Sequence, residues 1–574
     1  MNTRTTVAAL AAVLSAAAAF GDATIPFDPS TPAFKDQREH RSGSCIGYAG
    51  CVTDIGGKYT DEFMRDPDAL WEQFQKSGAY VVKQWSANED WNQSMAYQRL
   101  KTDAERAEFR RKYPNTTFVA PEKIWQWRKD HGIRILLCLE NYGVTTNYMP
   151  FTRTDDIAAV KEKILEMVQW IVDNGFQDQV IGFELGNEPY FGADPETYAA
   201  RWCEILPEIR KHWPDAKIGM PIAEYRAGDP DLDAVRRRLG EKKMMPGGGE
   251  FEINRFNQWS GRFVTAMSNE IDNISHVVYH FYGGDAAYGC SASGFGRVHN
   301  FAKIYPQIAG KRVWISEWRE RSDEDMRCHR MFFSTLWKAH YMLIVLAQPD
   351  VDGVNQHCIG CYSGGLNISM NCSFKDEPWR SGFHFQSDPA GGYNFYPDPD
   401  AGYGIRRYEV GPAGPLYRIY TDALMDHPII LEHGLYGKQG KEANFWTSAL
   451  YYAAGNAERA ALARGEPPSR VPRAKGNVEW IAALSGNRRS LALLMVNTTD
   501  EEQQFDVVLH GRTFAGPAKA QTVSCPHEYV YYYSIPAEPP LWSEGTQRFT
   551  SVYGERADIS IRPDTVQVVV FPLR

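Results

Sequence analysis

Apolar and polar residues alternate along this chain with two different periods, from about residue 44 to residue 357. Short apolar runs typical of buried strands take turns with longer stretches in which apolar residues recur every three or four positions, as on one helix face. Strands that alternate with helices form parallel sheets, because a crossover helix connects each strand to the next. The pattern predicts strands near residues 45–48, 79–85, 133–140, 180–186, 216–220, 275–281, 312–316 and 352–357.

Two of the intervening helices are well marked. The first has Thr154 as its cap and Gly175 as its stop. The second opens with Asp194 and Pro195, a capping side chain followed by a residue preorganised for the first turn. Each helix should bury one stripe against the sheet. These stripes are Ile157, Val160, Ile164, Val168 and Ile171 in the first helix, and Tyr198, Trp202, Ile205, Ile209 and Trp213 in the second.

Eight strands with helices between them favour a (β/α)8 TIM barrel. The main competitor is an open, doubly wound sheet. However, no glycine-rich phosphate loop follows the first strand, and the chain contains no P-loop. We therefore expect an α/β fold with a closed barrel.

The pattern changes beyond about residue 420. Short β-rich runs separated by turn residues predict an all-β sandwich domain. The expected domains are a catalytic barrel at 22–420 and a β-sandwich at 421–574, and the Gly-, Pro- and Tyr-rich segment 385–415 is either a loop over the barrel or a connection. The predicted sandwich strands are Trp480–Leu484, Ser490–Asn497, Gln504–Leu509 and Val566–Phe571.

Charge and the N-terminal segment narrow the class of protein. The 574 residues carry a formal net charge of −9, which opposes nucleic-acid binding because that needs a basic surface. Residues 1–21 combine Arg4, an apolar run and small residues, the pattern of a secretory signal cleaved near Gly21. No later segment is apolar for about 18 residues, so we expect an exported protein, periplasmic or secreted, without membrane insertion.

Ten cysteines in an exported chain make disulfides plausible. The candidates are Cys45 with Cys51, and two of Cys358, Cys361 and Cys372. A single C-x-x-C pair without a second one favours disulfides or burial over a zinc site.

Two carboxylates each end a strand that would otherwise be buried. Asn187-Glu188-Pro189 ends one apolar run, and Glu317 ends another. In a TIM barrel such strand ends form the active site, and an unpaired charge there is costly unless it faces a cleft. Hydrolysis of a glycosidic bond with retention needs an acid and a nucleophile roughly 5 Å apart. Glu188 and Glu317 are our candidates for these roles.

These residues resemble clan A of the glycoside hydrolases, in which Asn-Glu ends strand four and a Glu ends strand seven. The resemblance implies that Asn187 binds the sugar 2-hydroxyl, that Glu188 is the acid/base and that Glu317 is the nucleophile. His280 and Tyr282 resemble the H-x-Y of strand six, whose Tyr commonly contacts the nucleophile. The order of domains, a barrel followed by a sandwich, resembles that of families 51, 39 and 79 of the glycoside hydrolases.

The chain departs from the clan pattern at two strands. Many members end strand two with Arg, whereas this chain has Lys83, Gln84 and Trp85, and strand eight ends in Gln356-His357 where a Trp is common. The general chemistry tolerates these differences, but they leave the family open.

Polar and aromatic residues at other strand ends are substrate-binding candidates. The set is Lys83, Trp85, Glu140, Asn141, Glu224, Tyr225 and Trp318, together with Asn187, His280 and Tyr282. Arg319 and Arg321 either clamp an acidic sugar or form a solvated helix entrance.

The favoured function is a retaining glycosidase that acts on a glycan without metal or cofactor, since no H-x-H or H-E-x-x-H spacing is present. The alternatives are a non-catalytic carbohydrate-binding protein on a hydrolase-like barrel, and a transglycosylase. Arabinose, xylose, galactose, fucose and glucuronic acid units are all compatible with the sequence.

Overall fold

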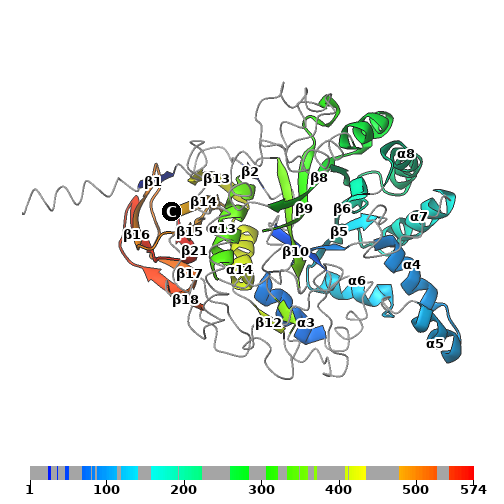
Figure 1. The fold of residues 1–574 in the computed structure, drawn as a ribbon. Helices are drawn as coiled ribbons and strands as arrows, with labels where there is room; N and C mark the ends of the chain where they lie inside the picture. Colours follow the sequence, from blue (N-terminus) through cyan, green and yellow to red (C-terminus); the bar gives the residue numbers. More distant parts are fainter. Residues whose placement is uncertain are drawn as a thin grey trace, which may run out of the picture.

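A closed barrel of parallel strands forms the centre of the molecule (Figure 1). The computed structural model describes residues 24–27, 35–36, 46–50, 67–78, 80–84, 87–112, 118–139, 157–191, 193–222, 259–283, 305–320, 332–347, 350–359, 368–370, 408–410, 413–434, 478–526 and 542–574. In the barrel each strand pairs with its neighbour in sequence order, and β10 closes it against β3. The strands are β3 (Ile46–Gly50), β4 (Val81–Gln84), β5 (Arg134–Leu139), β6 (Val180–Leu185), β7 (Ile218–Ile222), β8 (His276–Gly283), β9 (Arg312–Glu320) and β10 (Val351–Ile359). The predicted TIM barrel is confirmed, and each strand overlaps a predicted run.

Helices surround this barrel and bury their apolar stripes against it. Asp194 caps α8 by accepting from the backbone N–H of Thr197 at 3.0 Å, and Pro195 begins the helix, as its sequence predicts. The predicted stripe of α7 is buried from Val160 onward. The described helices are α3 (Pro67–Ser77), α4 (Ala87–Gln98), α5 (Asp103–Lys112), α6 (Pro121–Asp130), α7 (Ile157–Asp173), α8 (Pro195–His212), α13 (Phe332–Leu346) and α14 (Ala413–Asp426), with short 3₁₀ turns η2 (Gln177–Gln179), η3 (Pro189–Phe191), η4 (Ser268–Asn273) and η5 (Pro306–Ile308).

The barrel interior contains a large apolar plug. Trp314 of β9 packs inside with Leu136 and Val278. Its ring fits because Gly182 and Gly219 have no side chain: a Cβ on either glycine would lie within 2.7 Å of a Trp314 ring atom. This layer separates the N-terminal end of the barrel from its C-terminal end, where active sites of this fold lie.

Antiparallel sheets form the second domain. One sheet has the order β18-β17-β21-β15-β14-β13-β2 and the other β1-β16-β20-β19. The four predicted sandwich strands are present. The strands are β13 (Ile429–Gly434), β14 (Val478–Leu484), β15 (Ser490–Asn497), β16 (Gln503–Leu509), β17 (Ala518–Ser524), β18 (Ser543–Phe549), β19 (Val552–Tyr553), β20 (Arg556–Ile561) and β21 (Thr565–Pro572), and a separate two-stranded sheet joins β11 (Ile368–Met370) to β12 (Tyr408–Val410).

The N-terminal strands belong to the sandwich sheets. Strand β1 (Thr24–Phe27) pairs in parallel with β16, and β2 (Lys35–Asp36) pairs with β13. Both lie in the range 22–420 that the sequence assigned to the barrel domain. Helix α14, which ends at Asp426, packs against α3 and α13 and crosses the expected boundary at residue 420.

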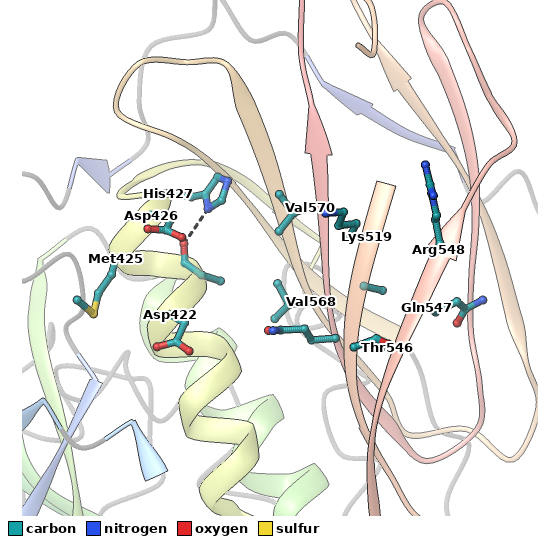
Figure 2. Close-up of a pocket in the computed structure, with 13 residues that line it drawn as sticks. Asp422, Met425, Asp426, His427, Lys519, Thr546, Gln547, Arg548, Val568 and Val570 are labelled. Atoms are coloured by element: carbon teal, nitrogen blue, oxygen red, sulfur yellow. Dashed lines mark hydrogen bonds between the residues drawn. The ribbon is translucent and has the colours of Figure 1, made fainter. Parts of the chain in front are cut away.

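Helices α13 and α14 lie between the barrel and the sandwich (Figure 1). Tyr420 donates to the carbonyl of Met495 at 3.0 Å, and His340 is hydrogen-bonded to Glu479. Beside the last turn of α14, a hollow of about 830 Å³ lies between Asp422 and Asp426 of the helix and Lys519 and Arg548 of the sheet (Figure 2). Among the described helices, none has the length and apolarity needed to cross a membrane.

Candidate active site

The C-terminal end of the barrel brings together residues from four strands. Lys83 lies on β4, Asn187 and Glu188 directly follow β6, His280 lies on β8 and Glu317 on β9. His280 and Glu317 are register partners across the β8–β9 pair. These five residues, all predicted from the sequence, therefore form one cluster.

Lys83 is the centre of this cluster. Its Nζ lies 3.0 Å from Glu184 Oε1, 3.0 Å from Asn187 Oδ1 and 3.2 Å from Glu317 Oε1. It also lies 3.0 Å from His280 Nε2 and 3.3 Å from Ser316 Oγ. Burial alone would lower the pKa of Lys83, but the charges of Glu184 and Glu317 outweigh burial and raise the pKa above its usual range. In the free enzyme Lys83 is therefore a buried cation in contact with the candidate nucleophile Glu317.

His280 connects the candidate acid to the candidate nucleophile. Its Nδ1 lies 2.9 Å from Glu188 Oε1 and 3.4 Å from Glu317 Oε2, while its Nε2 lies 3.3 Å from Glu184 Oε1. Burial acts to lower the pKa of His280, but the neighbouring carboxylates, Glu317 first, raise it to about 9 against the opposing charge of Lys83. A proton on this imidazole is thus shared among carboxylates.

Glu188 has a strained backbone. Its φ is +48°, in the left-handed region, and the following residue is Pro189, which disfavours helical conformations before it. Left-handed conformations of non-glycine residues cost about 1–3 kcal/mol and concentrate at functional sites. Tyr190 of η3 donates its hydroxyl to Glu188 Oε1 at 3.2 Å. The turn and this hydrogen bond fix the direction of the Glu188 carboxylate.

The two candidate carboxylates are close together and unequally exposed. A carboxylate oxygen of Glu188 and one of Glu317 lie within 4.8 Å of each other and of a His280 ring nitrogen. The Glu188 side chain is 19% exposed, whereas that of Glu317 is 4% exposed. The pair thus opens to solvent on the Glu188 side. These three groups have metal-ligand chemistry, but the Lys83 ammonium beside Glu317 opposes a further cation there.

Solved structures with this architecture come from glycosidases. An α-L-arabinofuranosidase from Thermotoga maritima in complex with arabinose aligns with 95% of this chain and 98% of its own, with a TM-score of 0.57 and 11% identity. A family 51 α-L-arabinofuranosidase from Bifidobacterium longum aligns over 96% and 99%, with a TM-score of 0.54 and 12% identity. A glucosidase from Croceicoccus marinus aligns over 96% and 99%, with a TM-score of 0.51 and 11% identity.

This chain has the fold of those glycosidases. Barrel and sandwich both align, as the coverage of whole chains requires. No protein-family model matches the sequence, and no curated protein matches it. At this identity the likeness establishes the fold, and the specific family is not assigned.

Trp318 does not reach the cluster, which corrects our expectation of a substrate contact. Its side chain is fully buried in the main core and packs against Tyr341 of α13, with ring centroids 4.3 Å apart. Side chains alternate along a strand, so Glu317 on the inner face places Trp318 on the outer face.

Several residues that the sequence predicts for the site, for disulfides or for a helix cap are not among those that the structure describes. Tyr282 is on β8, but its side chain is not among those described, and the same holds for Arg319 and Cys358. Outside the described residues altogether are Trp85, Glu140, Asn141, Glu224, Tyr225, Arg321, Cys45, Cys51, Cys361, Cys372, Thr154 and the segment 1–21.

Sequence reasoning missed three members of the cluster. Ser316 contacts Lys83, Tyr190 contacts Glu188, and Glu184 contacts both Lys83 and His280. Glu184 had a detectable signal. A carboxylate within the apolar run of β6, at an even spacing from Gly182, has to point into the barrel.

Proposed function

We propose that the protein is a retaining glycoside hydrolase with Glu188 as acid/base and Glu317 as nucleophile. The approach of one oxygen of Glu188 to within 4.8 Å of one oxygen of Glu317 carries this proposal. Retaining enzymes hold their carboxyl groups about 5–5.5 Å apart, whereas inverting enzymes need about 6.5–9.5 Å to admit a water. The glycosidase fold and the exposure of Glu188 support the same assignment.

In the first step Glu317 attacks the anomeric carbon as the bond to the leaving oxygen breaks. Glu188 delivers a proton to that oxygen, and the proton resides on the Glu188–His280 pair, whose Oε1 and Nδ1 lie 2.9 Å apart. In the second step Glu188 takes a proton from water, the water oxygen attacks the anomeric carbon, and the electron pair of the ester bond returns to Glu317.

Lys83 and Asn187 prepare this reaction. Lys83 donates to Glu317 and supplies the cation that many clan A members place on strand two as Arg. Lys83 also donates to Asn187 Oδ1, which leaves the Asn187 amide group to donate to the sugar 2-hydroxyl. The substrate is a glycan, and the similarity to arabinofuranosidases makes arabinofuranosides the first candidates.

A screen of purified residues 22–574 against plant, algal and host glycans tests the function, with Glu317→Gln as the control. We expect the wild type alone to release a defined sugar. Binding without turnover by both proteins would favour a carbohydrate-binding protein, and transfer to an added acceptor sugar would identify a transglycosylase. A 2-fluoro glycoside of the released sugar should leave an adduct on Glu317, and an adduct on another residue would refute the assignment.

We also propose that the protein is exported after cleavage near Gly21. The apolar run and small residues of the N-terminal segment support this. N-terminal sequencing of the protein recovered from outside the cytoplasm should begin near Asp22.

A further inference from the structure

Glu184 is a buried carboxylate one layer below the candidate catalytic pair. Its side chain is fully buried on β6, and its Oε1 accepts from Lys83 at 3.0 Å. Its Oε2 has no hydrogen-bond partner among the described residues. Buried ion pairs of this kind add little stability compared with apolar packing, so Glu184 invites a functional explanation.

The charge on Glu317 changes during the proposed reaction, and this change gives Glu184 a functional explanation that rests on the proposed function. In the free enzyme two carboxylates, Glu184 and Glu317, face the Lys83 ammonium. When Glu317 becomes a glycosyl ester it loses its charge. Among the described residues, Glu184 is then the carboxylate that remains within 3.0 Å of Lys83.

We propose that Glu184 is a positioning residue that holds Lys83 protonated and in place while Glu317 is esterified, so that Lys83 can stabilise the returning Glu317 carboxylate in the second step. Glu184 acts through Lys83 and does not touch the substrate. Its role is specific to deglycosylation, because in the first step the charged Glu317 itself retains the ammonium.

Removing the Glu184 charge should expose Lys83 to proton loss in the intermediate. The described titratable groups that face Lys83 are Cys138 on β5, Glu184 on β6, His280 on β8 and Glu317 on β9. With Glu184 neutral and Glu317 esterified, burial and the nearby His280 both favour a neutral lysine. Deglycosylation would then fail at alkaline pH, where the wild type still works.

The test is Glu184→Gln, which keeps the shape and removes the charge. On the substrate found in the glycan screen, pre-steady-state kinetics should show a burst of leaving group followed by slow turnover. We expect deglycosylation to slow roughly 10- to 100-fold, because loss of a directly donating group costs about 10²–10³-fold and Glu184 acts at one remove. The alkaline limb of turnover should move to lower pH. The 2-fluoro adduct should also reactivate more slowly than in the wild type.

Two further variants separate this role from a merely structural one. Glu184→Asp keeps the charge and should recover most of the deglycosylation rate and the alkaline limb. Asp352→Asn, a buried carboxylate at the other end of the barrel, should show neither burst nor pH shift. If Glu184→Gln does not fold, Glu184→Met decides, since it also removes the charge and keeps a side chain of similar length.

Unchanged deglycosylation in a folded Glu184→Gln, or in Glu184→Met where Gln does not fold, would overturn the proposal. An equal loss in both steps would overturn it too. Absence of turnover in the wild type would count against the proposed function instead, so the two failures are distinguishable.

Discussion

The two ends of the barrel each bury a histidine beside carboxylates, and the two arrangements differ in charge. At the N-terminal end His276 Nε2 lies 2.9 Å from Asp352, which also pairs with Arg312. The His276 ring stacks on Trp314, with ring centroids 3.9 Å apart. At the C-terminal end His280 contacts the carboxylates of Glu184, Glu188 and Glu317 and adjoins Lys83.

This difference in neighbours reverses the effect on the imidazole. Burial lowers the pKa of His276 despite Asp352, so it is a neutral hydrogen-bonding group. The carboxylates overcome burial and raise the pKa of His280 to about 9. His276 faces Asp352, which is already paired with Arg312, whereas three acids surround His280 beside Lys83. A pKa perturbed by several like charges in one place is typical of functional sites, and it is found at the C-terminal end of the barrel.

The largest expected difference between the two ends is in catalysis. Glu188→Ala should lose about 10²–10⁴-fold in kcat on substrates with poor leaving groups, because their departure needs the acid. Substrates with good leaving groups should lose little in the first step, and azide should restore part of the rate. Kinetics on a leaving-group series check this. An equal loss across the series without azide rescue would contradict the role of Glu188.

At the N-terminal end the same kind of change should affect stability alone. Asp352→Asn weakens contacts with His276 and Arg312 and should cost about 2–3 kcal/mol of unfolding free energy, as for hydrogen bonds to charged groups. Chemical denaturation measures the loss, and kcat per folded molecule should stay unchanged. A fall in kcat comparable to that of Glu188→Ala would erase the distinction between the ends.

The sequence predicts the positions of the barrel strands well, but it does not predict which side chains of a strand point into the barrel. The barrel strands were predictable because each is an apolar run between helices, and the polar residues that end them meet at one rim. Glu184 was missed and Trp318 was misplaced for one reason. Both require knowing which face of the strand is inward, and strand ends alone do not reveal it.

The sandwich shows a second limit of local pattern. Strand β17 reads as AKAQTVS, in which the exposed Lys519 and Gln521 interrupt the apolar positions, and β18 reads as SEGTQRF, in which most side chains are exposed. Strands β1 and β2 lie hundreds of positions from their partners β16 and β13, and no local pattern encodes that pairing. Pairing across the chain is decided by packing of the whole domain.

The apolar layer between the two ends gives a third prediction. In Gly219→Ala the new methyl would lie 2.5 Å from Val278 Cγ2 and 2.7 Å from Trp314 Cε3, so the plug has to shift. Overpacking of this kind costs about 1–3 kcal/mol. Denaturation curves should show the loss. Gly516→Ala is the control for a new methyl without crowding, since its Cβ would lie 3.9 Å from Pro572 Cγ, an ordinary contact.

The pH dependence of stability is the most direct test of the contrast between the histidines, because its sign differs between them. The native pKa of His276 lies below its unfolded value of 6.5, so its contribution to stability is present above pH 6.5 and falls as pH drops below it. The native pKa of His280 lies near 9, so its contribution is complete below pH 6.5 and is lost as pH rises toward 9. Each slope is at most about 1.4 kcal/mol per pH unit.

The measurement is the unfolding free energy of the wild type and of each variant between pH 5 and pH 9. The difference between the wild type and His276→Gln should rise with pH, and the difference between the wild type and His280→Gln should fall. Slopes of the same sign would show that the carboxylates around His280 do not hold its proton, and the proton shared by His280 and Glu188 in the proposed mechanism would lose its support.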